Sequence, residues 1–138
     1  MSAKDIFHNL VKDALQKEGW LITHDPYYVT WGSADYRIDL AAEEIIAAEK
    51  ESEKIAVEIK SFIGSSLTTD FHLAIGQFLN YRIALKQQDP NRKLYLAVSE
   101  NVFDSFFKTP IVQLTIQEYQ IKIVLFNPTT QTLTKWIK

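Results

Sequence analysis

The sequence has no cysteine, and only four glycines and four prolines interrupt its 138 residues. The lack of cysteine excludes disulfide bonds and thiolate metal sites, and it fits a cytoplasmic protein. No run of eighteen apolar residues is present, so we expect no membrane span. The first residues lack the basic start and apolar segment of a signal peptide. These absences together predict a cytoplasmic protein without a membrane segment.

Runs of basic residues are also missing. The formal net charge is −2 and the isoelectric point is about 5.9. A domain that binds nucleic acid by itself usually carries a basic patch. Any contact with nucleic acid should therefore be local, assisted by a metal ion, or shared with a partner protein. A metal-dependent nuclease stays compatible with this charge, because its metal ions supply positive charge at the site.

The remaining composition is that of an ordinary globular protein, with 46% hydrophobic and 23% charged residues. The length suits one domain, residues 1–138, and no repeat or linker divides it. Apolar residues at helical spacing predict helices over residues 3–18 and 70–88, and a shorter helix from Pro110 to about residue 119. Gly19 should end the first helix with positive φ, and Thr69 or Asp70 should cap the second.

Strand patterns occupy the rest of the chain. The expected strands cover residues 20–23, 35–43, 54–62, 94–98, 121–126 and 132–137. The glutamate-rich stretch 43–53 is most simply a solvated connection, and Ser99 caps a short helix that continues to residue 107. The order α-β-β-β-α-β-α-β-β predicts an α/β (α+β) fold, a mixed central sheet flanked by helices. The terminal strands, especially residues 122–126, are expected at an exposed edge, where a homodimer could form or a partner could bind.

Two acids and a lysine stand out on the predicted strands. Glu58 and Lys60 are two residues apart, so they share one face of strand 54–62. If strand 35–43 is its neighbour, Asp39 lies across from Glu58. Two carboxylates suit Mg²⁺ or Mn²⁺, which can also bind a substrate phosphate. Asp39 and Glu58 are thus candidate metal ligands, and Lys60 can orient a water or stabilise charge during phosphodiester cleavage.

Simpler interpretations exist for these residues. Glu-x-Lys on an exposed strand is often a weak ion pair. Gln77 and Tyr81 lie one turn apart on the second helix, where they could reach the sheet or stay at a rim. Aromatic residues 27, 28 and 31 could stack on bases, but packing beneath a loop is the simpler expectation, and His24 and Asp25 should shape a turn before Pro26.

Asp39, Glu58-x-Lys60 and Gln77-x-x-x-Tyr81 resemble motifs of the PD-(D/E)xK nuclease superfamily, over roughly residues 3–99. The resemblance implies a restriction-endonuclease-like core, with Asp39, Glu58 and Lys60 as catalytic residues. Many members add an acid from the first helix, for which Asp5, Asp13 and Glu18 are candidates. His8 lies one turn from Asp5 and could join the site, although a lone histidine on such a helix is usually a rim residue.

The whole chain is similar to a narrower group, the XisH family of cyanobacterial proteins. The similar stretches are residues 4–8, 19–26, 39–43, 55–62 and 71–78. The family is described as a controlling factor for excision of the fdxN DNA element, which implies DNA as a partner, together with an XisI-like companion protein and a site-specific recombinase. Two hypotheses follow: a metal-dependent nuclease domain, or a non-catalytic regulatory subunit that keeps a nuclease fold.

Overall fold

A mixed six-stranded sheet forms the centre of the computed structural model, which describes residues 5–33, 36–40 and 45–138, with only the backbone over 31–40. Its strands, in spatial order, are β1 (Leu21–His24), β4 (Ile45–Lys50), β5 (Glu53–Ile59), β6 (Arg92–Ser99), β7 (Ile123–Asn127) and β8 (Thr132–Ile137). The pairs β5–β6 and β6–β7 are parallel, whereas the outer pairs are antiparallel. The predicted α/β class, a mixed sheet flanked by helices, is confirmed.

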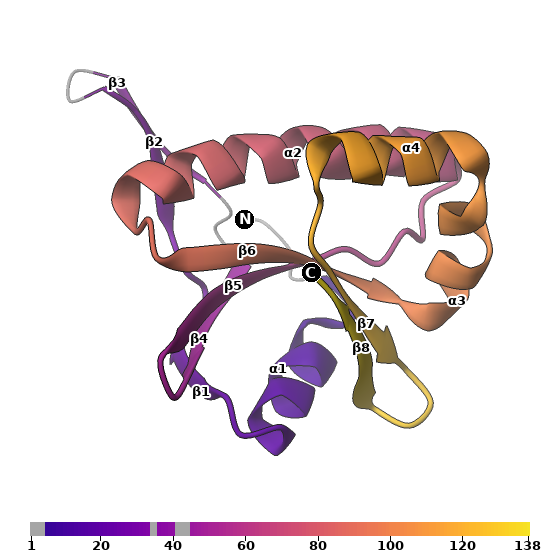
Figure 1. Cartoon of the computed structure of the whole chain (residues 1–138), viewed down its shortest axis with the longest axis horizontal. Helices are drawn as coiled ribbons and strands as arrows, with labels where there is room; N and C mark the ends of the chain where they lie inside the picture. Colours follow the sequence, from indigo (N-terminus) through magenta and orange to yellow (C-terminus); the bar gives the residue numbers. More distant parts are fainter. Residues whose placement is uncertain (1–4, 34–35, 41–44) are drawn as a thin grey trace.

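Helices cover both faces of this sheet. They are α1 (His8–Lys17), α2 (Leu67–Gln88), α3 (Glu100–Asp104), the short 3-10 helix η1 (Phe106–Lys108) and α4 (Pro110–Tyr119). The long α2 and the shorter α4 lie side by side over one face, and α1 lies against the other (Figure 1). None of the helices in the described part of the chain combines the length and hydrophobicity that a membrane span requires.

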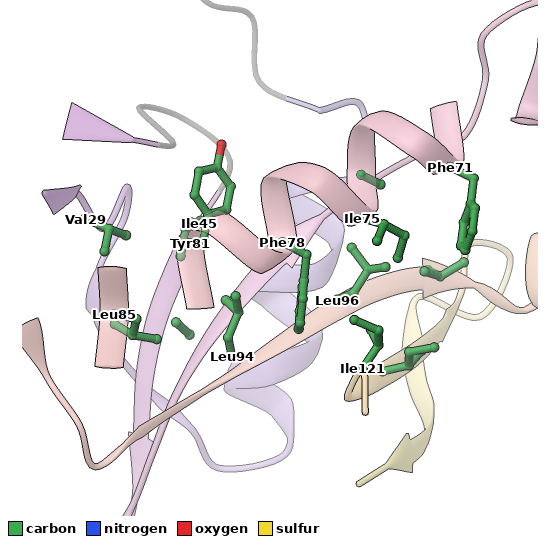
Figure 2. Close-up of a cluster of buried hydrophobic side chains, with 14 of the residues drawn as sticks. Val29, Ile45, Phe71, Ile75, Phe78, Tyr81, Leu85, Leu94, Leu96 and Ile121 are labelled. Atoms are coloured by element: carbon green, nitrogen blue, oxygen red, sulfur yellow. The ribbon is translucent and has the colours of Figure 1, made fainter. Parts of the chain in front are cut away.

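Alternating side chains of the central strands divide the core into two layers. Ala56, Leu94 and Leu96 point toward α2, where Phe78 is fully buried (Figure 2). Their neighbours on the strands point to the opposite layer and pack against α1; these include Ile55, Val57, Tyr95 and Ala97. The nearly continuous apolar run of β6 follows from this burial on both faces, as its sequence predicts.

The described residues between α1 and α2 contain five strands, so the predicted three-strand arrangement is wrong there. Ile45 to Ala48 are buried in β4, which lies between β1 and β5. The glutamates around this short apolar run conceal it, because they give residues 43–53 the composition of a solvated connection. Two further strands, β2 (Val29–Ser33) and β3 (Tyr36–Leu40), form a separate antiparallel hairpin.

The ends of the elements test several local predictions. Gly19 ends α1 with φ +96°, and Ser99 accepts a hydrogen bond from the Val102 N–H at the start of α3, both as expected. Ser66, rather than Thr69 or Asp70, caps α2, and its hydroxyl accepts the Thr69 N–H at 3.2 Å. β7 lies between β6 and β8, so the prediction of an exposed edge is wrong for residues 122–126, whereas the last strand, β8, does lie at the edge of the sheet.

Substitution of Phe78 measures how much the packing of α2 on the sheet contributes to the free energy of unfolding. Its ring is fully buried between α2 and the strands, whereas Ile83 of the same helix is 55% exposed. We expect Phe78→Ala to lower the free energy of unfolding by about 3–5 kcal/mol, because a large cavity is left. Ile83→Ala is the matched control and should cost less than about 1 kcal/mol. Urea denaturation of both variants checks this, and equal losses would contradict the assignment of Phe78 to the core.

Candidate functional site

Glu58 lies in the layer between the sheet and α2, and its side chain is fully buried. Ile45 is opposite it on β4, and Leu96 is beside it on β6. Both neighbours are fully buried apolar residues. A carboxylate in such surroundings is costly unless charged or polar groups compensate it, so this is an unusual place for an acid. The interpretation of Glu58 as one half of an exposed surface ion pair is therefore excluded.

Lys60 follows the end of β5 on the same face. Its N–H donates to the carbonyl of Ala97 at 3.2 Å, so the extended backbone continues one residue past the strand. The Lys60 ammonium lies 3.9 Å from Oε2 of Glu58, and its side chain keeps 20% of its exposure. The predicted side-by-side position of these two residues is confirmed. One end of the pair reaches solvent and the other is buried.

An open cavity of about 260 Å³ lies next to Lys60. Asp5 and Gln77, two of the predicted supporting residues, line it together with Lys60. Its other walls come from the loop after β5 and the first half of α2, and include Phe62, Gly64, Asp70 and Ala74. Oε1 of Gln77 is buried and accepts no hydrogen bond within the described residues. The cavity thus gathers two carboxylates, an amide and an ammonium group.

Among the acids proposed from the first helix, only Asp5 lies at this cavity. Asp13 is exposed on α1. Glu18 accepts a hydrogen bond from the indole N–H of Trp136 at 3.3 Å and lines a different cavity. Asp5 just precedes α1 and accepts the Phe7 N–H at 2.9 Å, which fixes its carboxyl group near the start of the helix.

The remaining predicted residues occupy other places. Asp39 lies on β3, opposite Thr30 of β2, and its side chain is outside the described residues. The predicted pairing of its strand with the Glu58 strand is wrong, because β4 fills that position. The approach of the Asp39 and Glu58 carboxylates stays a prediction. Tyr81 is 6% exposed and belongs to the core cluster around α2 (Figure 2), and it does not line the cavity.

His8 is a buried residue, so the expectation of a rim position is wrong. Its Nε2 lies 2.6 Å from Oδ1 of Asp25, and the Lys12 ammonium lies 2.8 Å from Oδ2 of the same carboxylate. Burial alone would raise the pKa of Asp25, but hydrogen bonds and charges of Lys12 and His8 bring that pKa below its usual value. Asp25 therefore ties α1 to the end of β1, a role beyond the turn expected from its sequence.

The loop after Lys60 has two features that its sequence does not reveal. Phe62 is buried at φ +55°, a conformation that is unfavourable for a bulky residue, and its ring packs edge-on against Phe107 at 5.3 Å. The Gly64 N–H donates to Oδ2 of Asp70 at 2.9 Å. A Cβ atom on Gly64 would lie 2.6 Å from the Asp70 carboxylate, so glycine permits this close approach. The loop beside Lys60 is consequently anchored at both positions.

Oxygen ligands at this site suit a hard divalent cation. Glu58, with Asp39 as predicted partner, offers carboxylate oxygens, and Mg²⁺ commonly uses one or two carboxylates together with waters and substrate phosphate. No group of three or more His, Asp or Glu residues able to hold a metal exists within residues 5–33, 36–40 and 45–138 as described. The residues that would hold such a cation here are Glu58 and, as predicted, Asp39.

Comparison with known proteins settles the family. The family model described as XisH protein matches residues 1–134. The chain belongs to the XisH family. A crystal structure of an XisH family protein from Nostoc punctiforme PCC 73102 is 43% identical, with a TM-score of 0.89 over 97% of this chain and all of that one. An fdxN element excision controlling factor protein from Anabaena variabilis is 40% identical, with a TM-score of 0.89 over 98% of this chain and all of that one. No curated protein matches.

Gly64 provides a test of the anchored loop in this XisH protein. We expect Gly64→Ala to lower the free energy of unfolding by about 1–3 kcal/mol, because the Asp70 carboxylate must leave its hydrogen bond with residue 64. Gly76→Ala is the matched control. Gly76 lies on α2, and a Cβ atom at this position would meet no atom of another element within 4 Å. That variant should gain about 0.5–1 kcal/mol. Chemical denaturation measures both free energies of unfolding. If both variants are more stable than wild type, Gly64 is not required for the anchored loop.

The ion pairs of Asp25 with Lys12 and His8 should make the free energy of unfolding depend on pH in the acid range. Because the folded protein lowers its pKa, the stabilisation is complete above the usual value of 3.8 and is lost as the pH falls through the lower folded pKa. We expect Asp25→Asn to be less stable than wild type at pH 6, and the difference to shrink below pH 3.8. Asp13→Asn on the exposed side of α1 is the control. If the difference in free energy of unfolding between wild type and Asp25→Asn is the same at pH 6 and below pH 3.8, the assignment of stabilising contacts to the Asp25 cluster (His8, Lys12 and Asp25) is contradicted.

Proposed function

We propose that this XisH protein acts in excision of a DNA element, and that the Glu58–Lys60 site performs metal-dependent phosphodiester cleavage. The observation that carries the proposal is the buried Glu58 carboxylate with the Lys60 ammonium 3.9 Å away, at the rim of an open cavity. The relative from Anabaena variabilis is named an fdxN element excision controlling factor protein, and this name supports the biological setting. The catalytic chemistry is our inference from the site.

Each residue would have a distinct task. Glu58 and Asp39 would hold Mg²⁺ or Mn²⁺, which lowers the pKa of a bound water and offsets phosphate charge when it is present. Lys60 keeps part of its surface exposed, so its ammonium group can contact a scissile phosphate and stabilise the charge that develops there. Asp5 and Gln77 face the same cavity and can position the attacking water or the phosphate by hydrogen bonds.

The buried position of Glu58 supports a role in chemistry over a role in stability. A fully buried carboxylate among apolar neighbours costs desolvation energy that an amide or an apolar side chain would avoid. Buried ionisable groups next to a cleft are common at functional sites, and Glu58 lies beside Lys60, which lines the cavity. The Phe62 backbone at φ +55° beside the cavity is a second unfavourable feature of the same region.

Cleavage of supercoiled DNA in Mn²⁺ tests the enzyme. We expect wild type to nick or cut the plasmid, and Glu58→Gln, Lys60→Ala and Asp39→Ala each to lower the rate by about 100-fold or more. Lys54→Ala is the matched control, because Lys54 is exposed at the start of the same strand. Circular dichroism would verify that each variant is folded. Equal rates in wild type and all three site variants would refute a catalytic site here.

A non-catalytic regulatory subunit is the second candidate. The net charge of −2 favours it, because a free-standing nuclease usually needs a basic surface for DNA. An excision assay in cells separates the two candidates with the variant Glu58→Gln, which keeps the shape of the side chain. Loss of excision supports the catalytic site, whereas full excision by a folded Glu58→Gln protein supports the regulatory role.

A further inference from the structure

A compact basic pocket lies at the far end of α2 from the loop that carries Lys60. It is formed by the last turns of α2, the start of β6 and the residue before β7, and has a volume of about 160 Å³. The charged side chains among its eight lining residues are Arg82, Lys86, Arg92, Lys93 and Lys122. Five of the eight lining residues are thus Lys or Arg and none is Asp or Glu, so the pocket is basic although the whole chain has a net negative charge.

Two of these cations have clear structural tasks. Arg92 is buried, donates to the Ala48 and Ile55 carbonyls, and pairs with Glu49 and Asp89. Arg82 donates through Nη1 to the carbonyls of Tyr119 and Gln120, which lie at the end of α4. The carbonyl end of a helix attracts cations, which accounts for Arg82. The strand carbonyls and the two carboxylates around Arg92 account for that residue, so both arginines would be expected even without a ligand.

The three lysines are not explained in this way. Lys86 lies in the last turn of α2, where the helix dipole gives it a modest benefit. Lys93 and Lys122 belong to β6 and to the connection before β7, so no helix end accounts for them. In the part of the chain that the structure describes, none of the three forms an ion pair with an acid. No carboxylate of the described residues therefore neutralises these three lysines, and an anion could do so.

We propose that Lys86, Lys93 and Lys122 form a phosphate-binding site for the backbone of a nucleic acid. Lysine ammonium groups bind phosphate as point charges, and a pocket with several of them and no acid selects for anions. Arg82 adds N–H groups beyond the Nη1 contacts described above. The inference rests on the proposed action on DNA, and it supplies the local basic contact that the overall charge of the chain does not.

The spacing of the two pockets along α2 suits a polymer. Gln77 lines the cavity at Lys60, and Arg82 and Lys86 line the basic pocket. Five to nine residues of helix correspond to about 8–14 Å of axis. One strand of duplex DNA presents a phosphate about every 3.4 Å of its axis. A segment of a few nucleotides therefore covers the component of this distance along the axis, while α2 turns by about 140–180° between Gln77 and the two cations.

The salt dependence of DNA affinity tests the site. We compare wild type with the triple variant Lys86→Ala, Lys93→Ala, Lys122→Ala by fluorescence anisotropy of a labelled duplex, in calcium to avoid cleavage. Each lost phosphate contact should reduce the slope of log affinity against log salt by about 0.9, so a loss of two to three is expected. The control is the triple variant Lys17→Ala, Lys54→Ala, Lys135→Ala, which removes the same charge from exposed positions elsewhere. Equal slopes in the two triple variants would overturn the site.

A second measurement separates this inference from the proposed cleavage. If the basic triple variant loses salt-dependent DNA binding while Glu58→Gln leaves cleavage unchanged, the basic pocket stands and the catalytic proposal fails. If Glu58→Gln abolishes cleavage while the basic triple variant binds DNA with the wild-type slope, the catalytic proposal stands and the basic pocket fails. Titration with inorganic phosphate, followed by amide shifts of residues 93 and 122, identifies the source of the anion. Shifts with phosphate but no binding of DNA would overturn the assignment to nucleic acid.

Discussion

The burial of one carboxylate, Glu58, is the constraint on which the rest of the site depends. The sheet and α2 form an apolar layer, and Glu58 is fully buried within that layer between Ile45 and Leu96. Such a group is tolerated only if its surroundings are held firmly, because a charge in a loosely packed layer would draw water into the core. The rigid packing of Phe78 and its neighbours is in this sense part of the site.

Two kinds of sequence pattern were informative about this fold. Apolar residues indicate α2 and β6 in different ways: α2 buries one face at helical spacing, whereas β6 is a nearly continuous apolar run that is buried on both faces. The Glu58-x-Lys60 adjacency followed from strand geometry alone and is found in the structure. Both predictions depend on neighbours within one element, for which the sequence carries the full geometric information.

Long-range partners were beyond the sequence. β4 was missed because its apolar stretch, Ile45 to Ala48, is too short to stand out between glutamates. The Asp25 cluster joins residues that are 13 and 17 positions apart, and the basic pocket draws its lysines from three separate elements. A search for basic runs could not find that pocket, because the chain path alone brings its members together. The same argument applies to Asp5. It differs from Asp13 because the start of α1 lies close to the loop after Lys60, and this proximity cannot be predicted from the sequence.

Gln88, the last residue of α2, connects this helix to the β2–β3 hairpin. Its amide donates to the carbonyl of Tyr28, and its carbonyl oxygen accepts the N–H of Thr30, which pairs with Asp39 across the hairpin. At the other end of the helix, Asp70 holds the Gly64 N–H. Asp70 and Gln88 are 18 positions apart on α2, which corresponds to about 27 Å of helix axis, and each position turns the helix by about 100°. One residue more or fewer in α2 would therefore rotate one of these anchors by about 100° away from its partner, so the two contacts at the ends of the helix constrain its length.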